Sequence, residues 1–240
     1  FQKIITLKPE TVKGYRDLAL LYAQNGKVDV AVQTLNEGLE KSDQPVILRL
    51  ERAALLRDTG DIQGALADFE QVIQEAPQLL DAYQSLALTY AGLDRPDKAI
   101  ETMDRGVKAN PDNVMLKVNR GGIFHSLGRP AGALKAYREA IAQAPEDPQV
   151  YRAMGFMAAE AESLQVAQQA WEKVRMLNPN DLEVRNALSQ LYLALGQLDA
   201  AIGELQALIE MAPDATPVRF RLGEAYMTKG EFELAKSEFR

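Results

Sequence analysis

Apolar residues follow one another along the chain in two alternating stripes of helical spacing. The first stripe of residues 80–113 consists of Tyr83, Leu86, Ala87 and Tyr90. These residues recur at i, i+3, i+4 and i+7 and therefore share one face of a helix. The second stripe has the same spacing, for example over residues 65–73. Two amphipathic patterns in succession predict a hairpin of two antiparallel helices.

Proline and small residues repeat with a period of 34. The prolines of this series lie 34 residues or a multiple of 34 apart, with Asp43 in the one vacant place: Pro9, Pro77, Pro111, Pro145, Pro179 and Pro213. With position 1 of the first complete repeat at Val12, position 20 is alanine in all seven copies, and position 15 is glycine in five. A glycine there is typical of the end of a helix.

This register divides the chain into one continuous solenoid domain of short units. The expected units are the end of a truncated repeat, six complete repeats and a truncated seventh: 1–11, 12–45, 46–79, 80–113, 114–147, 148–181, 182–215 and 216–240. Phe1 and Arg240 fall at positions 24 and 25, inside a second helix. We therefore expect the sequence to be a fragment of a longer chain.

The pattern resembles the tetratricopeptide repeat (TPR), whose helical hairpin carries characteristic residues at positions 4, 7, 8, 11, 15, 20, 24 and 32. The third repeat shows Tyr83, Leu86, Ala87, Tyr90, Ala99 and Pro111. The resemblance implies an all-α fold without strands, a right-handed superhelical solenoid of antiparallel helix hairpins with fifteen helical segments. Local packing is expected to differ where the chain departs from the pattern, at Asp43, Asp94, Ala158, Glu162 and the basic residues of position 4, Arg49, Lys117, Arg185 and Arg219.

Composition narrows the function further. The 240 residues carry 27 basic and 34 acidic side chains, a net charge of −7, which argues against nucleic acid as a partner. The absence of cysteine and the single histidine disfavour disulfides, metal sites and thiol or imidazole catalysis, so no cofactor and no metal are expected. No apolar run approaches the ~20 residues of a membrane span, so we expect a soluble segment without direct membrane insertion. The compartment stays open between cytoplasm and periplasm.

The sequence contains none of the spacings that mark an active site. It lacks a glycine-rich phosphate loop and an HExxH pair, and we expect no enzymatic activity. His125 is expected to be solvated or to line a groove, and Glu160 and Glu162 to lie in a solvated turn. Arg52 and Arg120, at the nominally buried position 7, are expected to bind a neighbouring carboxylate or carbonyl. Trp171 is expected to pack in the core.

A candidate binding surface consists of the first-helix positions that do not face the partner helix. Positions 2, 5, 9 and 12 share another face of each first helix, and the resemblance implies that this face lines a concave, ligand-binding groove. The candidate residues are Arg16, Leu20, Ile47, Leu50, Arg57, Gln84, Leu88, Met115, Val118, His125, Arg152, Phe156, Asn186 and Gln190. Its centre is apolar, and an exposed apolar strip indicates binding, although a closely wound superhelix would bury part of it.

Three functions remain open. The first is a scaffold that binds a peptide, a helix or a protein surface in the groove, and the second is a regulatory or substrate-recruiting arm of a larger enzyme or secretion component. The third is self-association through the ends of the solenoid. Position 6 carries asparagine only at Asn119, and no three consecutive repeats match the carboxylate clamp, so neither specialised TPR function is expected.

Overall fold

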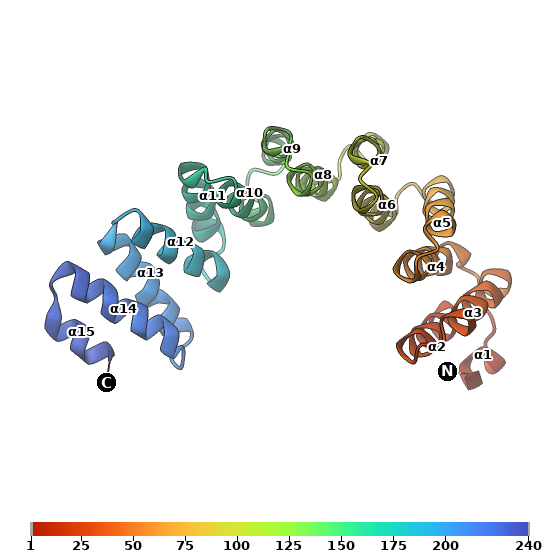
Figure 1. The fold of residues 1–240 in the computed structure, drawn as a ribbon, viewed down its shortest axis with the longest axis horizontal. Helices are drawn as coiled ribbons and strands as arrows, with labels where there is room; N and C mark the ends of the chain where they lie inside the picture. Colours follow the sequence, from red (N-terminus) through yellow and green to blue (C-terminus); the bar gives the residue numbers. More distant parts are fainter. Residues whose placement is uncertain (1, 240) are drawn as a thin grey trace. The chain divides into compact units, whose positions relative to one another are not determined.

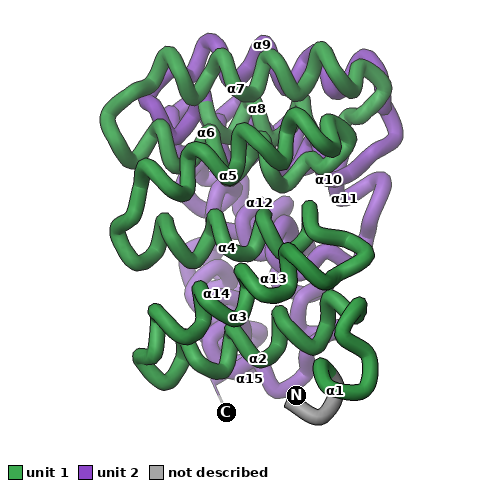
Figure 2. The backbone as a smooth tube through the Cα atoms, turned by 90° about the vertical axis from the view of Figure 1, so that its right-hand side faces the viewer, with its two compact units in different colours: residues 1–123 green, residues 124–240 purple. Residues whose placement is uncertain are grey.

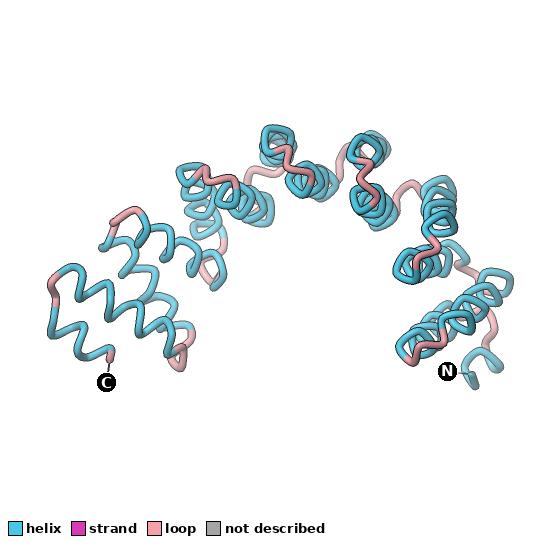
Figure 3. Tube along the Cα trace, viewed as in Figure 1, coloured by secondary structure: helices cyan, strands magenta, loops and turns pink. Residues whose placement is uncertain are grey.

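The computed structural model describes residues 2–239, with side chains from residue 5 onward, and these residues form fifteen helices and no strand (Figures 1 and 3). The first helices of the repeats are α2 (Val12–Gln24), α4 (Pro45–Thr59), α6 (Leu80–Gly92), α8 (Val114–Ser126), α10 (Pro148–Glu160), α12 (Leu182–Ala194) and α14 (Thr216–Lys229). The second helices are α1 (Gln2–Leu7), α3 (Val28–Lys41), α5 (Ile62–Glu75), α7 (Pro96–Ala109), α9 (Pro130–Gln143), α11 (Leu164–Leu177), α13 (Leu198–Met211) and α15 (Phe232–Glu238). The predicted all-α fold and its fifteen helical segments are confirmed. Phe1 and Arg240 lie outside the described residues.

The small side chains of the repeat mark close contacts between the two helices of a hairpin. Position 20 is fully or almost fully buried in all seven repeats, from Ala31 to Ala235. In the fifth and seventh repeats, position 8 faces an aromatic residue at position 24: a Cβ atom added to Gly223 would lie 2.5 Å from Phe239, and one added to Gly155 would collide with Trp171. In these two repeats, a larger residue at position 8 therefore cannot fit without displacing an aromatic ring.

The turn between the two helices of a hairpin uses a left-handed residue. The five glycines of position 15 have φ between +65° and +95°. Asp94 and Glu162, which replace glycine in the third and fifth repeats, both have φ of +56°. The departure in sequence therefore leaves the backbone turn unchanged.

Three of the four basic residues of position 4 bind the turn before their helix, whereas Arg49 pairs with Glu75. Lys117, Arg185 and Arg219 each donate a hydrogen bond to the carbonyl oxygen of the proline six residues earlier, at 3.1, 2.6 and 3.2 Å. The Tyr151 hydroxyl donates to Pro145 in the same way, at 3.1 Å. A lysine, an arginine or a tyrosine at position 4 can thus tie a first helix to the turn that precedes it.

The chain divides into two compact units, residues 1–123 and 124–240 (Figure 2). In the first unit, a core formed by Tyr15, Ala19, Ala31, Leu35 and Leu48 joins α2 and α3 to α4. In the second, the core of Ile202, Leu205, Leu222, Ala225, Tyr226 and Ala235 joins α13 to α14 and α15. Within each unit, apolar faces of one hairpin are therefore buried partly against the next helix along the chain, as expected for a repeat array.

Candidate binding surface

The first helices of residues 1–123 expose apolar side chains that the core does not use. Leu20 on α2 is 56% exposed, Leu88 on α6 is 45% exposed and Met115 on α8 is 41% exposed. Between α2 and α6 lies α4, which contacts both. We call positions 2, 5, 9 and 12 of α2, α4 and α6, together with positions 2, 5 and 9 of α8, the first-helix face.

A hollow of about 220 Å³ lies on this face between α2 and α4. Its wall includes Leu20, Ala54 and Leu55, with Arg16, Glu51 and Asp58 among its charged residues. Arg16 Nε lies 3.7 Å from Asp17 Oδ1, and Arg57 Nη2 lies 2.8 Å from Asp58 Oδ1. Sequence reasoning identified Arg16 and Leu20 but missed Glu51, Leu55 and Asp58, which belong to positions 6, 10 and 13. Their proximity to the face follows from the packing of α2 on α4.

The remaining apolar candidates of this unit are less accessible. Ile47 and Leu50 are half-buried. Val118 is only 8% exposed and belongs to the core, so the prediction of an exposed Val118 is wrong. The exposed strip is therefore interrupted at Val118.

Most polar candidates bind the neighbouring repeat. Gln84 Oε1 accepts a hydrogen bond from Asn119 Nδ2 at 3.1 Å. In residues 124–240, Asn186 Oδ1 accepts from Arg221 Nη2 at 2.7 Å. His125 Nε2 contacts the Glu160 carboxylate.

Arg152 pairs with Glu183 and lies 3.5 Å from Asp181 Oδ2, whereas Gln190 is exposed. These contacts join successive first helices, so Gln84, His125, Arg152 and Asn186 serve the stacking of repeats.

Phe156 is a core-packing residue as well as a surface one. Its ring lies edge-on to Trp171 at 5.1 Å between centroids, and the Arg152 guanidinium lies 5.8 Å from its centre. Trp171 is buried, as predicted. The expectation that Phe156 faces away from the core is therefore wrong, because its ring covers Trp171.

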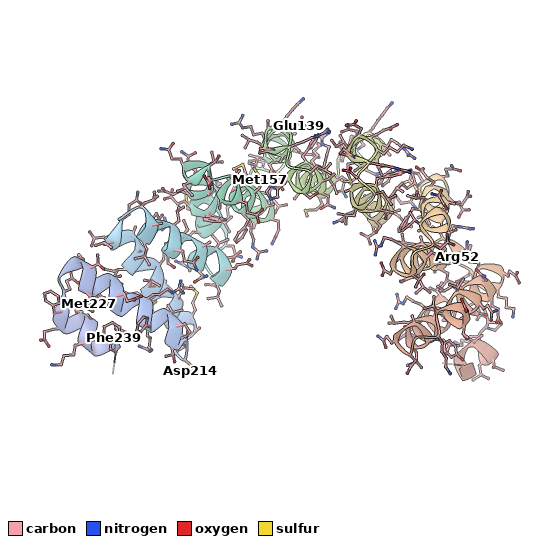
Figure 4. The ribbon with its side chains drawn as sticks, in the orientation of Figure 1. Arg52, Glu139, Met157, Asp214, Met227 and Phe239 are labelled. Atoms are coloured by element: carbon pink, nitrogen blue, oxygen red, sulfur yellow. The ribbon has the colours of Figure 1, made fainter. Side chains whose placement is uncertain are left out.

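The two arginines of position 7 are held by carboxylates, as predicted (Figure 4 labels Arg52). Arg52 donates two hydrogen bonds to Asp68, both 2.7 Å, and a third to Asn36 Oδ1 at 2.5 Å. Arg120 Nη1 donates to Asp104 at 3.0 Å. Each pair crosses from a first helix to a second helix.

Burial in the core raises the pKa of several tyrosines. Burial, followed by the charge of Glu160, raises the pKa of Tyr137 to about 12. Burial also raises the pKa of Tyr15, Tyr83 and Tyr192, the last with help from its hydrogen bond to Glu172.

The described residues offer neither a candidate metal site nor a candidate membrane-spanning helix. Within them, no group of three or more acidic or histidine side chains is placed to hold a metal ion. None of the described helices has the length and apolarity that crossing a bilayer requires.

Comparison with known proteins agrees with the repeat pattern. Two family models, each described as tetratricopeptide repeat, match the chain, one at residues 16–79 and 85–148 and the other at 158–215 and 192–240. RNA polymerase II-associated protein 3 of Xenopus tropicalis is 26% identical over 194 residues, which cover 74% of this chain and 28% of that protein. The BBSome complex member BBS4 homolog of Drosophila melanogaster is 22% identical over 197 residues, 81% of this chain and 40% of that protein. The chain thus spans less than half the length of these relatives.

Solved structures share the fold at low identity. The C-terminal part of a TPR repeat-containing protein from Cytophaga hutchinsonii has a TM-score of 0.61 at 13% identity, covering 90% of both chains. PilW, a type IV pilus biogenesis factor, has a TM-score of 0.60 at 18% identity, covering 88% of this chain and 97% of PilW. YrrB, described as a TPR protein with an unusual peptide-binding site, has a TM-score of 0.50 at 18% identity and covers 77% of this chain and 95% of YrrB. With the helical hairpins and the matched repeats, these findings show that the chain belongs to the tetratricopeptide repeat family.

Proposed function

We propose that residues 1–123 bind a protein or peptide partner on the first-helix face. The fold supports an interaction scaffold in general, and repeat scaffolds of this family are generally non-catalytic. The observation that carries the proposal is the exposure of Leu20, Leu88 and Met115 on three first helices of one unit. Exposed apolar side chains gathered on one face are typical of an interaction site.

The hollow between α2 and α4 supplies the anchor of this surface. Leu20, Ala54 and Leu55 would surround an apolar side chain of the partner, and Arg16, Glu51 and Asp58 would border it. A buried anchor in a pocket with a polar rim is the usual source of affinity at an interface. Because most of the contact is apolar, ~150 mM added salt should weaken the complex only slightly.

The test starts from a random peptide library displayed on phage and selected on the 240-residue chain. A recovered peptide is titrated against the unmodified protein, Leu20→Glu and Leu88→Glu. Both variants place a charge where the partner buries apolar surface, so we expect at least a tenfold loss of affinity. The melting temperature should change little, because both side chains are already about half-exposed.

Met176→Glu is the matched control. Met176 is 72% exposed on the second helix α11, outside the first-helix face, and its replacement should leave the affinity unchanged. Equal affinity of Leu20→Glu, Leu88→Glu and the unmodified protein would place the binding site elsewhere. Light scattering of the same samples tests self-association, which would appear as a mass above that of one chain.

Recruitment within a larger protein is the second candidate. The chain covers 28% of RNA polymerase II-associated protein 3 and 40% of the BBS4 homolog, which is the arrangement of a repeat segment inside a longer chain. The first-helix face would then deliver a bound partner to another part of the protein. In that case Leu20→Glu would abolish the recruited activity of the full-length chain without changing its activity towards an unrecruited substrate.

A further inference from the structure

One repeat lacks the large side chain that the others carry at position 11. This position is occupied by Tyr22, Leu56, Tyr90, Phe124, Ala158, Tyr192 and Tyr226. A cavity of about 210 Å³ lies at Ala158, within residues 124–240. Its walls include Pro130, Ala131 and Leu134 of α9, Met157 of α10, and Val166 of α11. Figure 4 labels Met157 on α10. We call this cavity the Ala158 pocket.

The tyrosines of other repeats show where the missing ring would lie. In the third repeat, the position-19 residue of the same hairpin, Lys98, places its Nζ 5.5 Å from the centre of the Tyr90 ring. Val166 holds position 19 in the fifth repeat and lines the Ala158 pocket. One wall of the pocket is therefore the wall that a tyrosine of position 11 contacts.

The hydroxyl groups of the position-11 tyrosines identify the helix that forms the second wall of the pocket. The Tyr192 hydroxyl lies 2.7 Å from Glu172, and the Tyr226 hydroxyl accepts a hydrogen bond from Gln206 at 2.8 Å. Both partners hold position 25 in the second helix of the preceding repeat. For Ala158 the corresponding helix is α9, which contributes Leu134 to the pocket. The Ala158 pocket therefore lies between the same two helices as a tyrosine ring of position 11.

The residue at position 25 of α9 is Arg138. In the other complete repeats this position carries Asn36, Glu70, Asp104, Glu172 and Gln206, so Arg138 is the one cation at position 25 among the six complete repeats. Its side chain is exposed and borders a second hollow along α9, which shares Ala131 and Leu134 with the Ala158 pocket. Glu139, labelled in Figure 4, lies on the same flank. A guanidinium has only donors to offer, and a phenol oxygen accepts hydrogen bonds.

We propose that the Ala158 pocket binds a tyrosine side chain presented by a partner protein. The ring lies between Leu134 and Val166, and the phenol oxygen accepts a hydrogen bond from Arg138. A dry cavity of about 150 Å³ lined by aliphatic side chains is large enough for benzene. Tyrosine is also among the residues that most often anchor an interface, since its ring buries a large area while its hydroxyl keeps a polar partner. This site is independent of the first-helix face.

The first experiment uses p-cresol, which is the tyrosine side chain without its backbone. It is titrated into the isotope-labelled 240-residue chain, and amide shifts are followed by NMR. We expect saturable shifts at Ala131, Leu134 and Val166, and at least fivefold weaker binding of toluene, which lacks the hydroxyl. Arg138→Leu should reduce the affinity for p-cresol to that for toluene.

Filling the pocket should abolish binding. Ala158→Tyr restores the residue of the other repeats, and Ala158→Leu, which copies Leu56, serves if the tyrosine variant does not fold. Either variant should lose the p-cresol shifts and melt at a higher temperature. Leu20→Glu should bind p-cresol unchanged, which separates this site from the first-helix face. Binding of p-cresol to the filled variants would overturn the proposal.

The second experiment distinguishes a partner's tyrosine from a free phenol. A random peptide library is selected on the unmodified chain after depletion on Ala158→Tyr. We expect tyrosine at one position to be enriched at least tenfold in the retained peptides. If the retained peptides show no enrichment of tyrosine, the pocket accepts small phenols only and the proposal is wrong.

Discussion

The residue at position 15 illustrates how one backbone conformation constrains seven repeats. Five repeats place glycine there at positive φ, whereas Asp94 and Glu162 adopt the same conformation with a side chain. A left-handed conformation costs an ordinary L-residue about 1–2 kcal/mol, and less for aspartate, which visits this region more readily. The repeat therefore keeps its turn by accepting local strain at two positions.

We expect Glu162→Gly to stabilise the protein. Relief of strain gains about 1–2 kcal/mol, and the greater freedom of glycine in the unfolded chain offsets about 0.5–1 kcal/mol of it. The free energy of unfolding, measured with urea, should rise by about 0.5–1 kcal/mol. Asp94→Gly should give a smaller increase, and Gly128→Ala, at φ of +65°, should lower the stability. A loss of stability in Glu162→Gly would contradict the interpretation that Glu162 is strained at its positive φ.

The sequence predicted the fold far better than the roles of single residues. The helices and the buried alanines of position 20 could be predicted because the same 34-residue pattern occurs seven times in this one sequence. The hydrogen bond from Arg185 to Pro179 could not be predicted, because its acceptor is a carbonyl group that every residue has. The burial of Val118 and the packing of Phe156 on Trp171 could not be predicted, because the spacing within one helix does not describe the helices that pack against it.

At the scale of helices, ion pairs between first and second helices differ in how much they contribute to stability. Arg52 and Arg120 hold the same position of alternate repeats, but Arg52 pairs with Asp68 of its own repeat, whereas Arg120 pairs with Asp104 of the preceding repeat. The Asp68 side chain is 9% exposed, whereas the Asp104 side chain is 55% exposed. Removing the partner of a buried carboxylate leaves an uncompensated charge, and removing the partner of an exposed one does not.

Arg52→Met should therefore cost more stability than Arg120→Met. Both changes keep most of the aliphatic stem, but only Arg52→Met leaves a buried carboxylate without its two charged hydrogen bonds. We expect losses of about 3 kcal/mol and about 1 kcal/mol in the free energy of unfolding. The double variant Arg52→Met with Asp68→Leu should regain most of the larger loss, since no charge is then left buried. Equal losses in the two single variants would show that burial of the carboxylate does not determine the cost of losing its arginine.

At the scale of the whole molecule, tyrosines in both units make the free energy of unfolding depend on pH in the alkaline range. Burial raises the pKa of Tyr15 and Tyr83 in residues 1–123, and of Tyr137 and Tyr192 in residues 124–240. An unfolded tyrosine has a pKa of about 10. The folded chain thus holds these protons more tightly than the unfolded chain, and both states are neutral at these groups below pH 10. Their contribution to stability is complete below pH 10 and is lost as the pH rises.

We expect the free energy of unfolding to fall steeply above pH 10, and Tyr137→Phe to reduce that slope. With a folded pKa of about 12, Tyr137 accounts for a loss of about 2 kcal/mol between pH 9 and pH 12. The measurement is a series of urea unfolding curves from pH 8 to pH 12 on the unmodified chain and on Tyr137→Phe. The difference between the two proteins at pH 8 gives the packing contribution of the hydroxyl, because the phenol is neutral in both states at that pH. The change in this difference with pH reports the ionisation alone. If the difference stays constant up to pH 12, Tyr137 ionises as readily in the folded protein as in the unfolded chain, and burial does not raise its pKa.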